Sequence, residues 1–570
     1  MKKTKDTQSF QLDVTEKYLL FPINDKKDKN TITILDNQGS LFLTFNARIT
    51  DKPPKYYIKI DVHTLIDTSI EIEISTSKPL LPFAEFIKQA ESYEHPDIEL
   101  HRPTYHYSSP EGWINDPVGL FYNKGIYHLY YQHNPYGMKW GNMSWGHATS
   151  ENLIDWTTQP LALVPNELGA IYSGSIVIDS QNCAGFGENA IIALYTAAAD
   201  TQTQCLAYST DDGYTFTNYE HNPILINEDK TDFRDPKVFW HTETNKWIMS
   251  LATSPTISFY SSTDLKEWTL ISEFGSGIGS HKGVWECPDL FKLPYGKTHR
   301  WVLLVSVNAG GPNKGSATQY FIGNFDGTTF TAETLPYPLW LDYGKDCYAG
   351  TTWHNNPKDK PLYIAWMSNW QYANILPTKT FKNAMTLPRT LDIGNNGEHM
   401  IVKSYPIREL KKKRERIEEF PTQLVDKAVD IEYLLDDNQG VYELILDFDI
   451  VDLNTSKIRV SLQNTVGESL QYTFNLNKGK LVIDRSTTGE HSFSKKFCKH
   501  KITAPLQIEK KYKLKLYIDK CSAELFINKG KTAMTNLIFP TEPYNTLNII
   551  VENGRIDITK FRIYSFHEEE

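Results

Sequence analysis

Five apolar runs, rich in β-branched and aromatic residues, recur at regular intervals through the middle of the chain. They begin at Ile126, Ala190, Lys246, Arg300 and Leu362, so that successive starts lie 54 to 64 residues apart. Each of the first four is followed by a turn-forming stretch that ends in an aromatic–Thr pair: SENLIDWT, STDDGYTFT, SSTDLKEWT and NFDGTTFT. Repeats of this period, with short strands between Gly, Asp and Asn clusters, are typical of propeller blades. The pattern predicts an all-β fold with a five-bladed β-propeller at its centre.

Alternating apolar and polar positions also flank the repeats. Before residue 99 the chain contains segments such as SIEIEIS, and beyond residue 420 it contains YELILDFDI, KIRVSLQN and KLKLYID, all of which predict strands. The charged segment YPIRELKKKRERIEEF lies between the repeats and the last strands, and its charge pattern predicts a helical linker.

A polar group opens a short apolar strand about eleven to sixteen residues before each run. The five segments are NDPVGLFY from Asn115, YSGSIVI from Tyr172, RDPKVFW from Arg234, ECPDLFKL from Glu286 and DCYAGTTW from Asp346. The first strand of a propeller blade lines the central axis. We therefore expect these five groups to meet in one polar pocket at one end of the axis.

The predicted pocket contains four acids, Asp116, Asp235, Glu286 and Asp346, with Arg234 beside them. Like charges in a small space raise the pKa of at least one carboxyl group, and we expect burial against Trp285 to raise that of Glu286 further. One protonated and one ionised carboxyl group form the arrangement that cleaves glycosidic bonds. Two other interpretations are open: a site for a hard cation, or acids that merely cap turns.

Composition narrows the choice of partners. The net charge is −10 and the pI about 5.9, which excludes a basic face for nucleic acid. The densest basic run, Lys411 to Arg416, alternates into acids and is expected to be solvated. No apolar leader or membrane span is expected, so the protein either stays in the cell or had its leader removed. The six cysteines are scattered, and we expect no disulfide framework, zinc site or other cofactor.

Three blocks, WINDPVG, FRDPKVFW and WECPDLF, resemble the signature blocks of glycoside hydrolase family 32, which includes invertases, inulinases and levanases. The resemblance extends from Trp113 to Arg389 and continues in AELFINKGKTAMTNLIFP near the C-terminus. It implies a C-terminal β-sandwich, and residues before 99 look like a small N-terminal β-sandwich module. The expected domains are 1–98 for this module, 99–405 for the propeller, 406–425 for the linker and 426–570 for the C-terminal sandwich.

The resemblance also implies roles for single residues. Asp116 matches the nucleophile, Glu286 the acid/base, and Asp235 the transition-state stabiliser. A retaining mechanism follows, with the first two carboxyl groups about 5–5.5 Å apart. The implied substrate-binding residues are Asn115, Gln132, Trp140, Tyr172, Ser173, Arg234, Asp346 and Trp366. Two positions depart from the family pattern: Val118 stands where Asn is usual, and Tyr172 where Phe is common.

We therefore expect a retaining enzyme that releases fructose from the ends of levan or inulin, and from sucrose. An endo-levanase, a fructosyltransferase and an arabinanase-like propeller hydrolase are enzyme alternatives, and a non-catalytic fructan-binding protein is an alternative of another class. No nucleic acid or membrane partner is expected. The C-terminal sandwich could mediate a homo-oligomer, and the N-terminal module either packs on the propeller or binds sugar.

Overall fold

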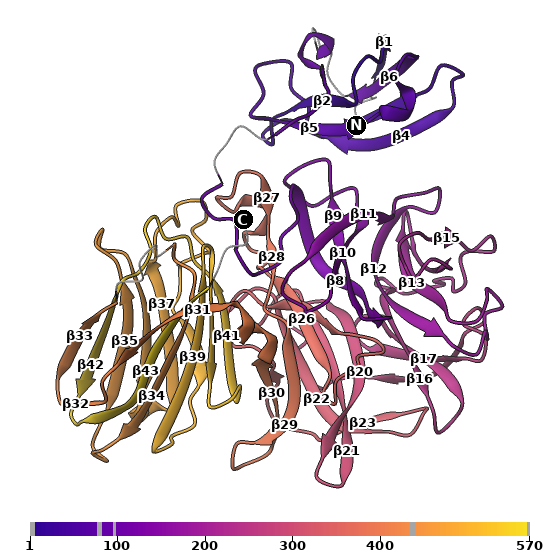
Figure 1. Cartoon of the computed structure of the whole chain (residues 1–570). Helices are drawn as coiled ribbons and strands as arrows, with labels where there is room; N and C mark the ends of the chain where they lie inside the picture. Colours follow the sequence, from indigo (N-terminus) through magenta and orange to yellow (C-terminus); the bar gives the residue numbers. More distant parts are fainter. Residues whose placement is uncertain (1–5, 77–82, 95–98, 434–438, 567–570) are drawn as a thin grey trace.

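The computed structural model describes residues 6–76, 83–94, 99–433 and 439–566, and strands dominate them. Figure 1 shows three bodies: a small N-terminal module, a ring of sheets, and a pair of sheets packed beside the ring. The helices of the described residues are short 3-10 turns of three to six residues. The predicted all-β fold is confirmed.

The ring consists of five blades of mostly antiparallel strands. Blade 1 contains β8 (Gly112–Asn123), β9 (Ile126–Asn134), β10 (Ser144–Ser150) and β11 (Thr157–Leu163). Blade 2 contains β12 (Ala170–Asp179), β13 (Ala190–Ala198), β14 (Gln202–Ser209) and β15 (Thr217–Asn218). Blade 3 contains β16 (Arg234–His241), β17 (Lys246–Ala252), β18 (Ile257–Ser262) and β19 (Thr269–Phe274).

Blade 4 contains β20 (Trp285–Tyr295), β21 (Thr298–Val307), β22 (Ala317–Phe325) and β23 (Phe330–Ala332), with β24 (Leu339–Trp340) paired to β22. Blade 5 contains β25 (Tyr348–Thr352), β26 (Leu362–Met367), β29 (Arg389–Asn395) and β30 (Met400–Pro406), with β28 (Ala384–Met385) paired to β26. The first strand of each blade contacts the first strands of its neighbours around the ring. The five apolar runs recognised in the sequence form the second strands, as the propeller prediction requires.

Two connections close the ring between its last and first blades. β27 (Phe381–Lys382) returns from blade 5 and pairs in parallel with the start of β8, with Phe381 opposite Gly112. Further along β8, the backbone of His354, which follows β25 in blade 5, forms the second connection. It donates to Leu120 O at 2.8 Å and accepts from Tyr122 N at 3.0 Å. Because both connections use backbone groups of β8, blade 1 is held in place by residues that follow it by more than two hundred positions.

The C-terminal body is a sandwich of two antiparallel sheets. The first contains β31 (Arg414–Phe420), β43 (Ile556–Phe566), β34 (Tyr442–Ile450), β39 (Lys511–Asp519), β40 (Ser522–Ile527) and β41 (Thr532–Leu537), with β32 (Gln423–Val425) paired to β43. The second contains β33 (Ala428–Glu432), β42 (Thr546–Glu552), β35 (Lys457–Gln463), β36 (Ser469–Asn475), β37 (Lys480–Thr487) and β38 (Ile502–Pro505). A large apolar core lies between the two sheets.

The prediction of a helical linker is wrong for most of its length. Arg408–Lys413 forms a 3-10 helix, but the following residues are the strand β31, in which Ile417 lies opposite Tyr564. The alternating charges of this segment suit a helix locally. Pairing with β43, the last strand of the chain, supplies backbone hydrogen bonds that local charge spacing cannot reveal.

The N-terminal module is also built from two sheets. One contains β1 (Asp6–Asp13), β6 (Ser69–Thr76), β3 (Asn30–Leu35) and β4 (Leu41–Ala47), and the other β5 (Tyr56–Asp61), β2 (Tyr18–Ile23) and β7 (Lys88–Ala90). Alternate residues are buried, as in the run of isoleucines of β6, and they form a separate core. In Figure 1 the module sits above the ring, next to β9 and β27.

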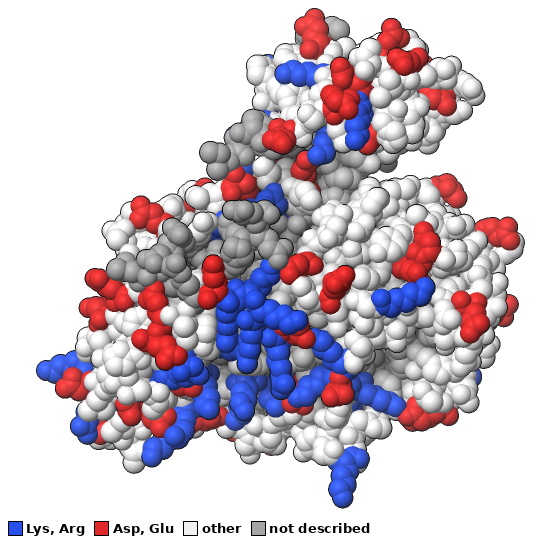
Figure 2. Space-filling view, viewed as in Figure 1, with Lys and Arg blue, Asp and Glu red and all other residues white. Residues whose placement is uncertain are grey.

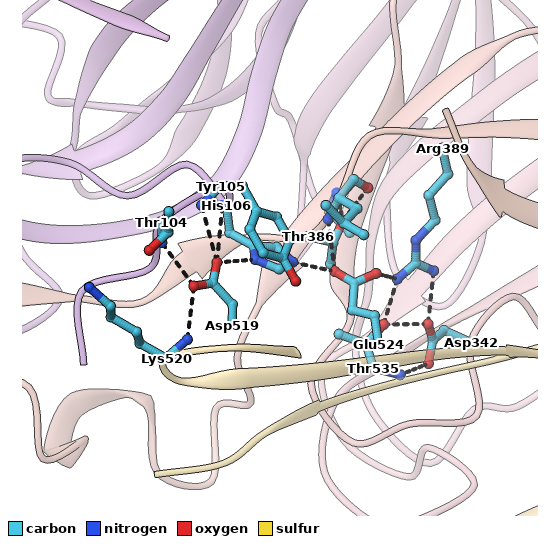
Figure 3. A network of polar contacts seen from close by, with 12 residues as sticks. Thr104, Tyr105, His106, Asp342, Thr386, Arg389, Asp519, Lys520, Glu524 and Thr535 are labelled. Carbon is cyan, nitrogen blue, oxygen red and sulfur yellow. Dashed lines mark hydrogen bonds and ion pairs between the residues drawn. The ribbon is translucent and has the colours of Figure 1, made fainter. Parts of the chain in front are cut away.

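A buried polar network joins the propeller to the C-terminal sandwich (Figure 3). The His106 ring lies between two carboxylates, 2.7 Å from Asp519 Oδ2 and 3.0 Å from Glu524 Oε1. Arg389, which is fully buried, donates to Glu524 Oε2 at 2.6 Å and to Asp342 Oδ2 at 2.8 Å. Removing one partner from such a network leaves an uncompensated buried charge, so the network couples the two bodies.

Lysine and arginine side chains gather where the ring meets the sandwich (Figure 2). A groove of about 630 Å³ in this region is lined by Lys358, Lys360, Lys403, Arg408 and Lys529 together with acids. Lys360 and Lys403 both pair with Asp392, at 2.7 and 3.1 Å. Much of the positive charge is therefore compensated locally.

Across the described ranges, none of the helices has the length and apolar character needed to cross a bilayer.

Replacing His106 by Gln should lower the free energy of unfolding by about 3–5 kcal/mol near pH 6, because the buried Asp519 loses its cation and Glu524 keeps only Arg389. Burial alone would lower the pKa of His106, but the hydrogen bonds that its ring donates to Asp519 and Glu524 raise it to about 9. A raised pKa contributes stability that is complete below about pH 6.5 and is lost as the pH rises through 9.

The difference in unfolding midpoint between wild type and H106Q, measured by calorimetry from pH 6 to 10, should therefore shrink as the pH rises. His63, whose side chain is 63% exposed beside Asp61, offers the matched variant H63Q, which should change stability by less than about 1 kcal/mol. An equal deficit of H106Q at pH 6 and pH 10 would show that the charge on His106 stabilises nothing.

Candidate functional site

All five inner strands carry a β-bulge at the same height. In each, the pairing with the second strand skips two residues. The skipped residues are Asn115–Asp116, Tyr172–Ser173, Asp235–Pro236, Cys287–Pro288 and Ala349–Gly350. A bulge breaks the ladder and turns side chains away from the sheet. Here five equivalent bulges turn side chains toward one end of the propeller axis.

Three of the bulges place a residue other than glycine in the left-handed region. The φ angles are 64° at Asp235, 49° at Cys287 and 53° at Ala349. Such conformations are costly and persist only where the surroundings impose them. In these three bulges a freed backbone amide donates to a side-chain acceptor of the preceding blade.

The acceptors of the bulge amides are hydroxyl or carboxylate oxygens. Asp235 N donates to Thr196 Oγ1 at 3.0 Å, and Ala349 N donates to Ser306 Oγ at 3.1 Å. Cys287 N donates to Asp235 Oδ2 at 2.9 Å. Each of these three bulges is therefore held by the blade before it, and the pocket depends on blade-to-blade contact.

Two carboxylates from different blades lie on either side of the Cys287 thiol. Its Sγ is 3.6 Å from Asp116 Oδ2 and 3.6 Å from Asp235 Oδ2. Ser173 Oγ donates to the same oxygen of Asp116 at 2.8 Å. The other oxygen, Asp116 Oδ1, is buried and has no hydrogen-bond partner among the described residues. Within the described part of the chain, the cluster thus leaves one buried carboxylate oxygen without a hydrogen bond.

Arg234 brings a third carboxylate to the group. Its Nη2 donates to Glu286 Oε1 at 2.9 Å, its Nε lies 4.0 Å from Asp235 Oδ2, and its Nη1 pairs with Asp232. The guanidinium side chain is only 11% exposed. One buried cation thus faces several carboxylates, so the pocket keeps an excess of negative charge.

The surroundings of Glu286 differ from those expected from the sequence. Neighbouring residues of a strand point to opposite faces, and the indole of Trp285 is buried away from the pocket, stacked on His281 at 4.5 Å. The carboxylate instead accepts hydrogen bonds from Arg234 and from the Tyr348 hydroxyl. The interpretation that Trp285 encloses this carboxylate is wrong.

Burial and mutual repulsion raise the pKa of two acids. Burial, and then the charge of Glu286, raise the pKa of Asp116 to about 6 although Ser173 opposes the shift. Burial also raises the pKa of Asp235 to about 7, against the opposing effect of Arg234. Interacting acids titrate as a group, so the cluster exchanges protons close to neutral pH. This is the range in which acid–base catalysis is effective.

Most of the predicted binding residues surround this cluster. Asn115 is adjacent to Asp116 and accepts from the Trp113 indole at 2.8 Å. Gln132 is buried and donates to Ile171 O at 3.0 Å, which joins blade 1 to blade 2. Trp140 is 44% exposed, and its ring meets that of Tyr172 edge-on at 6.0 Å. These two rings form an accessible aromatic wall next to the Ser173–Asp116 pair.

Two predicted residues do not reach the pocket. The Asp346 carboxylate is fully buried, where it accepts from Arg485 at 2.6 Å, from the Tyr372 hydroxyl at 2.5 Å and from Leu537 N at 2.8 Å. It binds the propeller to the C-terminal sandwich. Trp366 has no exposed surface and donates its indole N–H to Ile114 O, so it supports the pocket from behind and presents no face to a ligand.

Sequence reasoning missed Tyr348 and the bridging position of Cys287. Both lie in the segments that open the blades. For blade 5, however, the sequence predicts that the acid, Asp346, is the pocket residue. The bulge of β25 begins at Ala349, three residues after Asp346. When the five strands are aligned on their bulges, the pocket residue of blade 5 is next to Ala349, where Tyr348 lies.

No group of three or more His, Cys, Asp or Glu residues within the described ranges is arranged to hold a metal ion. The acids of the pocket are balanced by Arg234 and by hydrogen bonds from Ser173 and Tyr348.

Comparison with known proteins identifies relatives for most of the chain. The family described as "Glycosyl hydrolases family 32 N-terminal domain" matches residues 106–404, and "Glycosyl hydrolases family 32 C terminal" matches residues 409–565. A levanase of Bacillus subtilis is 39% identical over 477 residues, which cover 82% of this chain and 70% of the relative. An extracellular exo-inulinase of Aspergillus niger is 33% identical over 527 residues, which cover 84% of this chain and 96% of the relative.

Solved structures agree with these relatives. The exo-inulinase of Aspergillus awamori superposes with a TM-score of 0.76 at 32% identity, covering 83% of this chain and 99% of that one. A fructofuranosidase of Schwanniomyces occidentalis in complex with fructosylnystose gives a TM-score of 0.73 at 31% identity, covering 82% and 98%. The N-terminal module lies before residue 106, outside the matched family region.

Replacement of aspartate by asparagine should have opposite effects on the free energy of unfolding at Asp116 and at Asp346. Asp116→Asn removes a carboxyl group whose pKa is raised, and such a group destabilises the fold above its pKa. The gain should reach about 1–3 kcal/mol above pH 6 and disappear below about pH 4. Asp346→Asn should instead cost about 3–5 kcal/mol, because Arg485 stays buried without its carboxylate.

Denaturant unfolding of both variants and wild type at pH 4 and pH 8 measures these differences. A less stable D116N protein at pH 8 would contradict the repulsion within the cluster. A D346N protein as stable as wild type would show that the Arg485 contact does not hold the two bodies together.

Proposed function

The chain belongs to glycosyl hydrolase family 32, and from that premise we propose that it is a β-fructosidase that releases fructose from β-fructans and sucrose. The observation that supports this function best is the meeting of three carboxylates from three blades. Asp116 and Asp235 flank one thiol at 3.6 Å, and Arg234 joins Glu286 to Asp235.

Two displacements account for hydrolysis at this site. Asp116 attacks the anomeric carbon of the terminal fructosyl unit while Glu286 gives a proton to the glycosidic oxygen, and the rest of the chain leaves as an alcohol. Glu286 then takes a proton from water, the water oxygen attacks the anomeric carbon, and Asp116 is released. Two inversions give net retention, for which carboxyl groups about 5–5.5 Å apart are required.

The surrounding contacts suit these roles. Asp116 Oδ2 accepts from Ser173, which orients the carboxylate that attacks. Tyr348 and Arg234 orient the Glu286 carboxyl group. Asp235, fixed by the Cys287 amide, can accept hydrogen bonds from fructose hydroxyls that strengthen as charge develops on the ring. Trp140 and Tyr172 provide an apolar wall for the furanose.

A blocked axis favours attack at chain ends. Beyond the bulges, Lys237 joins three inner strands: its Nζ donates to Thr351 Oγ1 at 2.8 Å and Thr352 O at 2.6 Å, and lies 3.4 Å from Asp289 Oδ2. These side chains fill the axis below the acids. A pocket that is closed at its inner end accepts one terminal sugar, and we infer exo-action from the non-reducing end.

Glu286→Gln should lower the turnover of levan, inulin and sucrose by about 10²–10⁴-fold, because glutamine cannot supply the proton. Release of fructose from each substrate measures the effect. Glu243, an exposed acid of blade 3 whose side chain is 55% accessible, provides the control E243Q, which should hydrolyse at the wild-type rate. Turnover by E286Q equal to wild type would defeat the assignment of the acid/base.

The wild-type product profile tests the mode of action. Chain-end attack should yield fructose from the first minutes of levan or inulin hydrolysis, without intermediate oligosaccharides. A ladder of oligosaccharides would identify an endo-acting enzyme instead, and fructose transfer to added sucrose would identify a transferase. A wild-type protein that binds levan but releases nothing would be a binding protein.

A further inference from the structure

One loop carries the accessible wall of the pocket and also the docking surface of the N-terminal module. Residues 135–143 connect β9 to β10 and contain Trp140. The side of this loop away from the pocket packs against the module. The loop forms no strand and includes Gly137 and Gly141. Asn134, at the end of β9, holds it from the propeller side: its Oδ1 accepts from Tyr136 N at 3.0 Å and its Nδ2 donates to Lys139 O at 2.7 Å. Contacts with the module hold the opposite side.

The Asn142 side chain forms the central contact. Its Oδ1 accepts from Asn46 N at 2.8 Å, and its Nδ2 donates to Asn46 O at 2.8 Å and to Asn134 Oδ1 at 2.9 Å. Asn46 lies in β4, an edge strand of the module. One amide therefore satisfies both backbone groups of an edge-strand residue and ties them to the end of β9. Asn142 itself has a φ of 46°, which asparagine tolerates better than most residues.

Apolar and polar contacts on both sides of Asn142 complete the junction. Met138 is buried within the module core, and the ring of Tyr136 lies 4.7 Å from that of Phe45. Met138 N donates to the Tyr56 hydroxyl at 3.3 Å, and Lys139 Nζ donates to Asp25 O at 2.9 Å.

On its other side the loop faces the pocket. Trp140 N donates to Asn374 Oδ1 at 3.0 Å, and its ring meets Tyr172, the residue before Ser173. Ser173 in turn donates to Asp116. Contacts thus continue from the module, through a loop of nine residues, to the aromatic wall and the nucleophile.

We propose that the N-terminal module is a positioning element of the substrate site: it holds Asn142 and Met138 so that Trp140 is fixed before substrate arrives. This inference rests on the proposed function, because Trp140 is the wall for the fructosyl unit. Ordering a free loop on binding costs about 1 kcal/mol or more per residue that becomes fixed. A loop fixed in advance avoids this cost, which appears as tighter binding.

Asn142→Gly is the sharpest variant, because glycine keeps the left-handed backbone while the bridging amide is removed. It should raise KM for sucrose and for fructan about 3- to 10-fold and leave kcat within about twofold, as expected when binding rather than chemistry is weakened. Tyr56→Phe should act in the same direction. Asn142→Asp, which keeps the acceptor for Asn46 N, should fall between glycine and wild type. Thr44→Ala, an exposed change on the same strand β4, should match wild type.

A double-mutant cycle with Trp140→Ala shows whether Asn142 acts through the wall. In the W140A background, N142G should raise KM no further, because the group it positions is gone. The same 3- to 10-fold increase in both backgrounds, or a loss in kcat alone, would overturn the proposal.

Hydrogen exchange supplies a readout that does not need turnover. Backbone amides of residues 136–142 should exchange faster in N142G than in T44A, while those of β8 stay protected. Unchanged exchange in the loop would refute the proposal even if the wild type cleaves fructan. A wild type that cleaves no fructosyl substrate would instead refute the proposed function, and the exchange result would still decide whether the module fixes the loop.

Discussion

The site depends on one backbone irregularity repeated five times. An inner strand that kept its full ladder would alternate its side chains between the two faces of its blade, and none of the acids would meet. Each bulge leaves two residues out of the ladder. At three of the five bulges, a hydroxyl or carboxylate oxygen of the preceding blade accepts a hydrogen bond from the freed backbone amide. Thr196, Asp235 and Ser306 perform this role. The pocket therefore exists only when the ring is closed.

Two classes of buried acid occur in this protein and differ in their partners. Asp346, Asp342, Asp519 and Glu524 each lie against an arginine or a histidine and join the ring to the C-terminal sandwich. Asp235 shares one guanidinium with Glu286, and Asp116 lies beside them across the Cys287 thiol; burial raises the pKa of both aspartates. The first class stabilises the assembly. The second class stores electrostatic repulsion, which substrate chemistry can use because protons move easily within the cluster.

The junction between the module and the loop adds a second level of organisation. The bulges and the ring, which hold the acids of the pocket, lie within the region shared with the relatives. The Trp140 loop is different, because its far side is completed by residues before 106, outside that region. A module that appears in Figure 1 as an appendage is thus in contact with the edge of the pocket. Its contacts combine hydrogen bonds to backbone groups, through Asn142 and Tyr56, with apolar packing of Met138 and Tyr136.

Local patterns determined a large part of this protein. The five-fold repeat, the second strands of the blades, the β-rich flanking bodies and the acids Asp116, Asp235 and Glu286 all follow from apolar periodicity, turn residues and short motifs, which act between near neighbours. Tertiary structure decided what near neighbours do not carry. Strand β31 forms because it pairs with the end of the chain, and Asp346 faces Arg485, 139 residues away, because the bulge of β25 starts later than its acid. Trp366 is buried, Tyr348 reaches Glu286, and Asn142 captures Asn46 for the same physical reason: each partner comes from another blade or another body, and only the closed fold brings them within bonding distance.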